Sequence, residues 1–259
     1  MDYGDYLKLD TLLSAQAPLS GEHDELLFIV IHQATELWLK LSLHELEAAR
    51  SDIRADNLPP AFKALSRVAR IQASMIQAWE ILATMTPADY AEFRDRLGSS
   101  SGFQSAQFRQ LEYLLGAKDG RHLQSHREGS AGRAALEAAL AAPSLYDEAL
   151  RLLARRGFAI PADHLERDWT QPYAASPEVE TAWLAVYRDA QRHWDLYELG
   201  EKLVDLDYRL QQWRFTHMKT VERIIGFKRG TGGSEGANYL ARALAQRLFP
   251  ELLDLRTAM

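Results

Sequence analysis

The 259-residue sequence contains no cysteine. This absence excludes disulfides, thiolate zinc sites, cysteine-held iron–sulfur clusters, thiolate-ligated haem and a nucleophilic cysteine, and it fits a reducing compartment. Long apolar runs are also lacking, because the longest, residues 26–31, is far short of the roughly 20 residues that a membrane helix needs. The acidic first residues have no apolar core of the kind found in a signal peptide. We therefore expect a cytoplasmic protein that neither spans nor binds a membrane.

Positive charge is scarce as well. The 30 lysine and arginine residues are outnumbered by 36 aspartate and glutamate residues, which leaves a formal net charge of −6. A mildly acidic chain has no general attraction for nucleic acid or anionic lipid. Apolar residues make up 47% and charged residues 25% of the chain. These shares are typical of a globular protein and exclude a disordered or collagen-like chain.

Helical periodicity dominates what is present, and no segment shows the strict alternation of a strand. Over residues 62–82, apolar side chains recur at steps of three or four, which is the pattern of one helix face. Thr86, Ser144 and Ser176 each precede a proline or an acidic residue in a pattern that is typical of a helix start. The sequence therefore predicts an all-α fold, with one domain over residues 1–259 built from several long helices.

The longest predicted helix follows an apolar stripe from residue 177 to residue 225. At 1.5 Å per residue this helix would be about 70 Å long. That length exceeds the width of a small domain, so we expect the helix to bend or to pack partly against another subunit. Gly226 is the predicted end of the helix.

Two histidines lie in apolar helical surroundings. His32 follows residues 28–31, and His217 lies on the same stripe as Leu210 and Trp213. Taken alone, such a histidine is more often a satisfied core residue than a ligand. The alternative is a haem ligand, because histidine is the favoured protein ligand for haem iron when cysteine is absent. Other metal sites are disfavoured, since the sequence has no Glu-x-x-His and no His-Glu-x-x-His motif.

Two further features suit either binding or plain surface structure. The glycine-rich segment 230–236 lacks the Gly-Lys-Ser/Thr ending of a phosphate-binding loop, so it is a ligand lid or a flexible loop. Arg94 follows Tyr90 by four residues on a predicted helix, and both project from one face. An arginine can hold a carboxylate through two parallel hydrogen bonds. Spacing alone nevertheless favours a surface arginine paired with Asp89 or Asp95.

Six motifs spread over the whole chain carry a family resemblance. They are residues 3–7 (YGDYL), 28–38 (FIVIHQATELW), 100–105 (SSGFQS), 213–218 (WRFTHM), 225–234 (IGFKRGTGGS) and 249–253 (FPELL). Together they resemble the bacterial tryptophan 2,3-dioxygenases. The resemblance implies an all-α homotetramer that binds haem b, ferrous in the active form. It also implies an oxidoreductase that inserts both atoms of O2 across the indole C2–C3 bond of L-tryptophan, giving N-formyl-L-kynurenine in the first step of the kynurenine pathway.

The resemblance further implies roles for residues around the haem. His217 matches the proximal ligand of the haem iron. Trp79, Ser101 and Gly102 match residues near the haem. His32 matches the catalytic histidine that accepts a hydrogen bond from the indole N–H. We expect positioning to account for most of the rate gain, and His32 need not act as a strong base because electron-rich indole can be attacked without full N–H deprotonation.

Substrate contacts follow from the same resemblance. Phe28 matches the aromatic wall of the indole pocket, and Arg94 matches the clamp on the substrate carboxylate, with Tyr90 beside it. Thr231 matches a contact to the ammonium and carboxylate groups, on a lid over residues 227–237.

The start of the chain, residues 1–20, matches an N-terminal arm. Its residues Tyr3, Tyr6 and Leu7 match a segment that completes the pocket of a neighbouring subunit.

Two other functions stay open from the sequence. One is a related haem enzyme that acts on another indole, although Arg94 and Thr231 argue for an amino-acid end on the substrate. The other is non-catalytic, either a haem sensor or carrier or a helical bundle without a cofactor.

Overall fold

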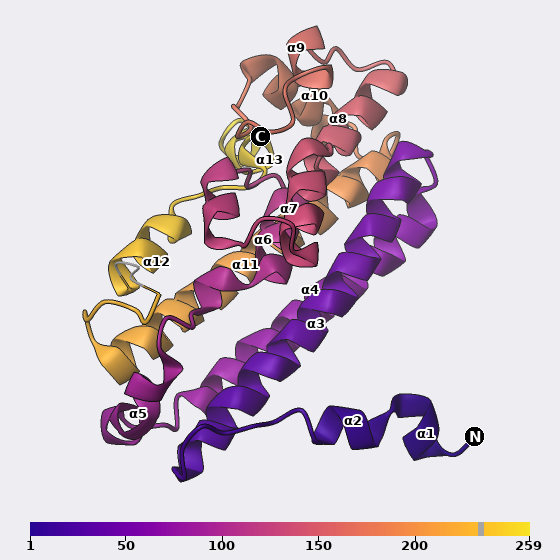
Figure 1. Cartoon of the computed structure of the whole chain (residues 1–259). Coiled ribbons are helices and arrows are strands. Elements are labelled where there is room, and N and C mark those ends of the chain that lie inside the picture. The colour runs from indigo at the N-terminus through magenta and orange to yellow at the C-terminus, as the bar shows by residue number, and fades with distance from the viewer. Residues whose placement is uncertain (233–235) are drawn as a thin grey trace.

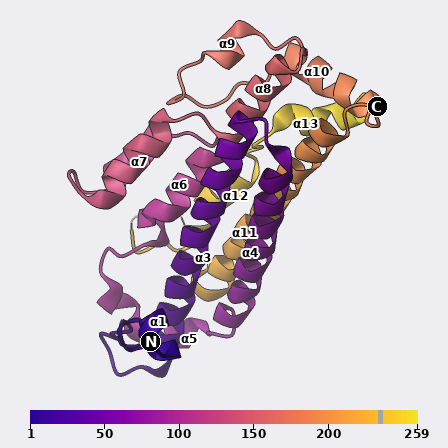
Figure 2. The ribbon, with the colours of Figure 1, turned by 90° about the vertical axis from the view of Figure 1, so that its right-hand side faces the viewer.

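Three long helices run side by side through the molecule (Figures 1 and 2). They are α3 (His23–Arg54), α4 (Leu58–Leu82) and α11 (Trp194–Ile225). The structure is a computed structural model that describes residues 1–232 and 236–259. Every regular element in these residues is helical, so the predicted all-α fold is confirmed.

Shorter helices surround these three. Their bounds are Tyr3–Leu7 (α1), Leu9–Leu13 (α2), Pro87–Arg94 (α5), Ala106–Leu114 (α6), Ala131–Ala141 (α7), Leu145–Arg155 (α8), Ala162–Leu165 (α9), Pro177–Arg188 (α10), Ala237–Leu244 (α12) and Pro250–Asp254 (α13), with 3-10 turns at Asp95–Leu97, Gly102–Gln104, Gly120–Ser125 and Leu255–Thr257. α5 lies near one end of the bundle, and α8, α9, α10 and α13 gather near the other (Figure 1). α6 packs against α3, and α12 packs against α11.

The predicted helix starts are confirmed. The Thr86 hydroxyl accepts a hydrogen bond from the Asp89 backbone N–H at 3.3 Å, and the Asp89 carboxylate accepts one from the Thr86 N–H at 2.8 Å. Ser144 and Asp147 form the same reciprocal pair at the start of α8, and Ser176 caps α10. These bonds satisfy first-turn N–H groups that have no partner within the helix. The pair at Thr86 defines where α5 begins, and α5 carries two of the predicted substrate residues.

The prediction of one helix over residues 177–225 is wrong. α10 ends before residues 189–193, and α11 starts after them. Asp189 leaves the helical region with φ −126° and ψ 53°. The rings of Tyr187 and Tyr197, one on each helix, pack with centroids 4.8 Å apart. Segment 189–193 (DAQRH) contains a single apolar residue, so it has almost nothing to bury that would hold a continuous helix. The predicted end at Gly226 is confirmed.

The core lies between the long helices. Leu46 of α3, Val68 of α4 and Leu206 of α11 are fully buried in one cluster. Burial of one such side chain is worth about 1.5–3 kcal/mol. Because many residues of this kind tie the three helices together, the side chains that they carry into a site are held by a rigid frame.

One helix, α3, is long and apolar enough to cross a membrane by length and composition. It runs alongside α4 in both views (Figures 1 and 2). Its buried residues include the carboxylate-bearing Glu25 and Glu45. Glu45 pairs with Arg67 of α4, and a helix that turns a charged group toward a neighbouring helix has the pattern of a bundle helix rather than of a lipid-facing one.

Candidate active site

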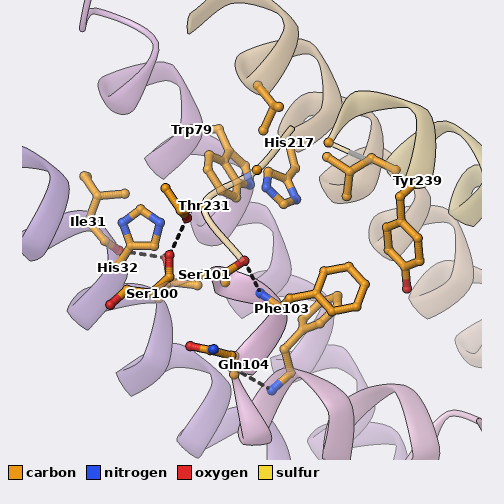
Figure 3. A pocket seen from close by; sticks show the side chains of 18 of the residues that line it. Ile31, His32, Trp79, Ser100, Ser101, Phe103, Gln104, His217, Thr231 and Tyr239 are labelled. Carbon is orange, nitrogen blue, oxygen red and sulfur yellow. Dashed lines mark hydrogen bonds between the residues drawn. The ribbon is translucent and has the colours of Figure 1, made fainter. Parts of the chain in front are cut away.

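A cavity of about 510 Å³ opens between α3, α4, α6, α11 and α12 (Figure 3). This volume lies within the range of small-molecule and cofactor pockets. Eight of the residues predicted from the sequence line it: Phe28, His32, Trp79, Tyr90, Ser101, Gly102, His217 and Thr231. Most of its wall is aromatic or aliphatic, with polar groups at a few positions.

Two tryptophans enclose the ring of His217. Trp79 stacks on it with ring centroids 4.4 Å apart and planes 10° apart, and Trp213 lies 5.2 Å away. His217 Nδ1 and the indole nitrogens of both tryptophans are buried without a hydrogen-bond partner among the described residues. Burial lowers the pKa of His217 from 6.5 to about 3. The ring is therefore neutral, which is the form that binds a metal.

His32 reaches the same cavity from α3. Its Nδ1 lies 2.7 Å from the carbonyl oxygen of Phe28, one turn earlier, and its ring centroid lies 4.1 Å from that of Phe28. Because a carbonyl only accepts hydrogen bonds, Nδ1 carries the proton in the neutral ring and Nε2 keeps a free lone pair. Burial lowers the pKa of His32, although the Phe28 carbonyl and the Glu36 charge oppose this. His32 can thus accept a hydrogen bond without being charged.

The aromatic wall next to His32 comes from two helices. The ring centroid of Phe28 in α3 lies 6.0 Å from that of Tyr90 and 5.7 Å from that of Phe93. The centroids of these two α5 rings are 5.4 Å apart. The wall suits a flat aromatic ligand.

Arg94 does not line the cavity in this structure. Its Nη2 donates to the carbonyl oxygen of Arg229 at 2.8 Å, and its Nε is buried without a partner among the described residues. The carboxylate of Asp89 is engaged by the backbone of Thr86. Arg94 thus lies one turn beyond Tyr90 and holds the base of the glycine-rich loop.

The described part of the predicted lid lies against the segment before α6 (Figure 3). The Thr231 hydroxyl donates to the carbonyl oxygen of Ser100. A Cβ on Gly232 would lie 2.6 Å from the Ser101 Cβ. The close approach of the loop to Ser101 therefore needs a glycine at position 232. Residues 233–235 of the predicted lid lie outside the described residues.

The N-terminal arm carries three more predicted residues that, like Arg94, do not line the cavity. α1 and α2 project from the bundle (Figure 1). Tyr3 is 74% exposed and Tyr6 is 72% exposed, and Leu7 is also exposed. These residues contribute nothing to the cavity of their own chain as the structure describes it.

Sequence reasoning missed four charged residues of the cavity wall, Glu36 and a cluster of three. Arg109 and Glu112 pair on α6, and Arg214 of α11 donates from Nη2 to Glu112 Oε1 at 2.7 Å. A signal existed for Arg214, which precedes His217 by three residues and so shares its helix face. Arg109 and Glu112 on α6 are three residues apart, which is the spacing of an ordinary surface ion pair. Nothing in the neighbouring sequence indicates that this pair is buried.

Known proteins resemble the chain over its full length. A family model described as tryptophan 2,3-dioxygenase matches residues 1–259. The tryptophan 2,3-dioxygenase of Cupriavidus necator is 61% identical over 257 residues, which cover 99% of this chain and 87% of the relative. The enzyme of the same name from Erythrobacter litoralis is 60% identical over 257 residues, which cover 99% of this chain and 98% of the relative.

The fold and the site define an all-α, haem-dependent oxidoreductase with two neutral histidines in one cavity. The chain belongs to the tryptophan 2,3-dioxygenase family. The interpretation as a cofactor-free bundle is therefore wrong.

Proposed function

We propose that this chain uses haem b and O2 to open the indole ring of L-tryptophan. Both oxygen atoms enter across the indole C2–C3 bond, and the product is N-formyl-L-kynurenine, which begins tryptophan degradation by the kynurenine pathway. The observation that carries the proposal is that neutral His217 and neutral His32 reach one apolar cavity from two helices.

His217 is the residue that holds the haem iron in this proposal. The three buried nitrogens of His217, Trp79 and Trp213 lack partners among the described residues, which fits a pocket that takes up a cofactor. A neutral imidazole amid stacked aromatic rings fits a flat apolar cofactor. We assign Ser101 and Gly102 to the haem surroundings because they line the same cavity. Ferrous haem supplies the oxygen chemistry when it is bound.

His32 and Phe28 orient the indole. The protonated Nδ1 of His32 donates a hydrogen bond to the Phe28 carbonyl oxygen. The other ring nitrogen, Nε2, is therefore left to accept a hydrogen bond from the indole N–H. The rings of Phe28 and Tyr90 bound the space that an indole would fill. Holding C2 and C3 in one place lowers the entropic part of the barrier. Removal of the indole proton by a strong base is not required.

Arg94 and Thr231 bind the amino-acid end of the substrate. Both side chains donate to backbone carbonyls, Arg94 to Arg229 and Thr231 to Ser100. A substrate carboxylate is a stronger acceptor than a carbonyl for an arginine. We therefore propose that binding transfers the Arg94 guanidinium from the loop backbone to the carboxylate, with the loop of residues 227–237 closing as the lid.

The chain assembles as a homotetramer in this proposal. Leu26, Val30, Leu37 and Trp38 are 47%, 43%, 50% and 39% exposed and follow one face of α3. An exposed apolar stripe of this kind marks a protein–protein contact.

The chain forms a single domain over residues 1–259, and residues 1–20 are its N-terminal arm. Its exposed Tyr3, Tyr6 and Leu7 complete the pocket of a neighbouring subunit. A cytoplasmic location fits the absence of cysteine.

The decisive experiment mixes reduced, haem-loaded protein with L-tryptophan in air and follows the near-ultraviolet absorbance. We expect a rising band at longer wavelength than indole, because the product is an aryl ketone. Haem-free protein is the control. A normal Soret band without any rise would support the haem sensor instead, and turnover of tryptamine or D-tryptophan in preference to L-tryptophan would support a different indole substrate.

A further inference from the structure

A buried cluster of three charged residues lies in the cavity wall. Arg109, Glu112 and Arg214 are 4%, 5% and 2% exposed. Both arginines pair with the single carboxylate of Glu112, Arg109 through Nη1 and Arg214 through Nη2. The cluster therefore holds one positive charge in excess.

The two arginines also have unused donors. The Nε atoms of Arg109 and Arg214 are buried without a hydrogen-bond partner among the described residues. A buried donor on a charged group is costly when it stays unpaired. Surplus positive charge and free N–H groups at one wall of a cavity together fit an anionic ligand group.

The cluster lies next to the proposed haem ligand. Arg214 precedes His217 by three residues on α11, so both side chains project from one helix face. The Arg109 guanidinium lies 5.4 Å from the Phe108 ring centroid, and the Phe108 ring lies 4.7 Å from that of Trp213, which contacts His217.

The other charges of the cavity leave this cluster free for the cofactor. Glu36 lies beside His32 and accepts a hydrogen bond from Gln107. The carboxylate of the substrate is assigned to Arg94, which lies outside the cavity lining. Haem b brings two carboxylates, its propionates, on an otherwise apolar ring.

We propose that Arg109 and Arg214 bind one haem propionate, while the carboxylate of Glu112 offsets one of their two positive charges. This inference rests on the proposed function, since it assigns residues to a cofactor of the same cavity. One surplus charge matches one carboxylate, so the cluster accounts for one of the two propionates. Planar guanidinium groups suit this task because they bind carboxylates through paired hydrogen bonds.

The test titrates the full-length haem-free protein with ferric haem and with its dimethyl ester, following the Soret band. Wild-type protein should bind haem at least about tenfold more tightly than the ester, which lacks the negative charges. Arg109→Met should remove most of this preference by weakening haem binding while leaving ester binding nearly unchanged. Arg121→Met is the matched control, since that arginine is exposed and paired with Asp119 away from the cavity.

A second variant should keep the preference that Arg109→Met loses. Glu112→Gln removes the competing carboxylate, so the preference for haem over the ester should stay or grow. If Arg109→Met does not fold, as judged by circular dichroism, the wild-type comparison and Glu112→Gln still decide. Equal wild-type affinity for haem and ester, or a loss of preference in Glu112→Gln, overturns the inference. Failure to bind either compound would instead contradict the proposed function.

Discussion

The indole ring of Trp79 lies parallel to the imidazole of His217, with centroids 4.4 Å apart and planes 10° apart. Trp79 comes from α4 and His217 from α11, so the stack joins two of the three long helices at the cavity. The contact sets the tilt of an imidazole that has no hydrogen bond on its buried nitrogen among the described residues.

Trp79→Ala should destabilise the protein by about 3–5 kcal/mol, the usual cost of emptying a buried tryptophan site. It should also weaken haem retention, because the His217 ring loses the surface against which it stacks. Urea unfolding and the rate of haem loss to apomyoglobin measure the two effects. Trp79→Phe keeps a ring and should lose less of both. Retention of haem at the wild-type rate in Trp79→Ala would show that the stack does not position the ligand.

His217→Ala should abolish the wild-type Soret spectrum of the purified protein, because no other cavity residue that the structure describes offers a neutral imidazole at the same place. Added imidazole should restore part of the spectrum by filling the space. His44→Ala changes an exposed histidine and should leave the spectrum unchanged. An unaltered spectrum in His217→Ala would rule out this residue as the ligand.

His32→Ala should weaken tryptophan binding and slow turnover, yet leave measurable activity. The lost hydrogen bond is worth about 0.5–1.5 kcal/mol, which is about a two- to tenfold loss in affinity. Steady-state kinetics with haem-replete protein measure both. Activity that vanishes while haem and substrate still bind would instead identify His32 as an obligatory base.

Arg94→Ala should lower the affinity for L-tryptophan by about a hundredfold or more. Two charge-assisted hydrogen bonds are removed, each worth about 1.5–3 kcal/mol, and part of this is offset because the wild-type side chain must leave the Arg229 carbonyl. Binding of tryptamine, which has no carboxylate, should change little. Arg96→Ala, at an exposed arginine two residues away, is the control. A change below tenfold for L-tryptophan would mean that another group holds the carboxylate.

The haem-free protein should lose stability in mild acid. Burial lowers the pKa of His217 from 6.5 to about 3, so below pH 6.5 the unfolded chain binds a proton that the folded chain does not. This contribution is fully present above pH 6.5 and is lost as the pH falls toward 3, with a slope of up to about 1.4 kcal/mol per pH unit. Urea unfolding between about pH 7.5 and pH 5 measures it. His217→Gln should flatten the slope, and an equal slope in both proteins would contradict the depressed pKa.

The sequence by itself determined the local structure of the helices. Thr86 and Asp89, or Ser144 and Asp147, lie three residues apart, so their hydrogen bonds form wherever the chain starts a helix. Six of the eight predicted residues that meet at the cavity lie in motifs whose neighbours along the chain carry most of the signal, and only Trp79 and Tyr90 lie outside them.

Only the tertiary structure decided where the long apolar stripe breaks and which charges are buried. The polar segment 189–193 permits a turn, and the packing of Tyr187 on Tyr197 across it is a contact that periodicity alone does not reveal. Glu112 meets Arg214 from 102 residues away along the chain, and Arg94 meets the Arg229 carbonyl from 135 residues away. The first contact is buried, and burial strengthens the attraction between the charges but also costs their hydration, so its net stability depends on every helix packed around it.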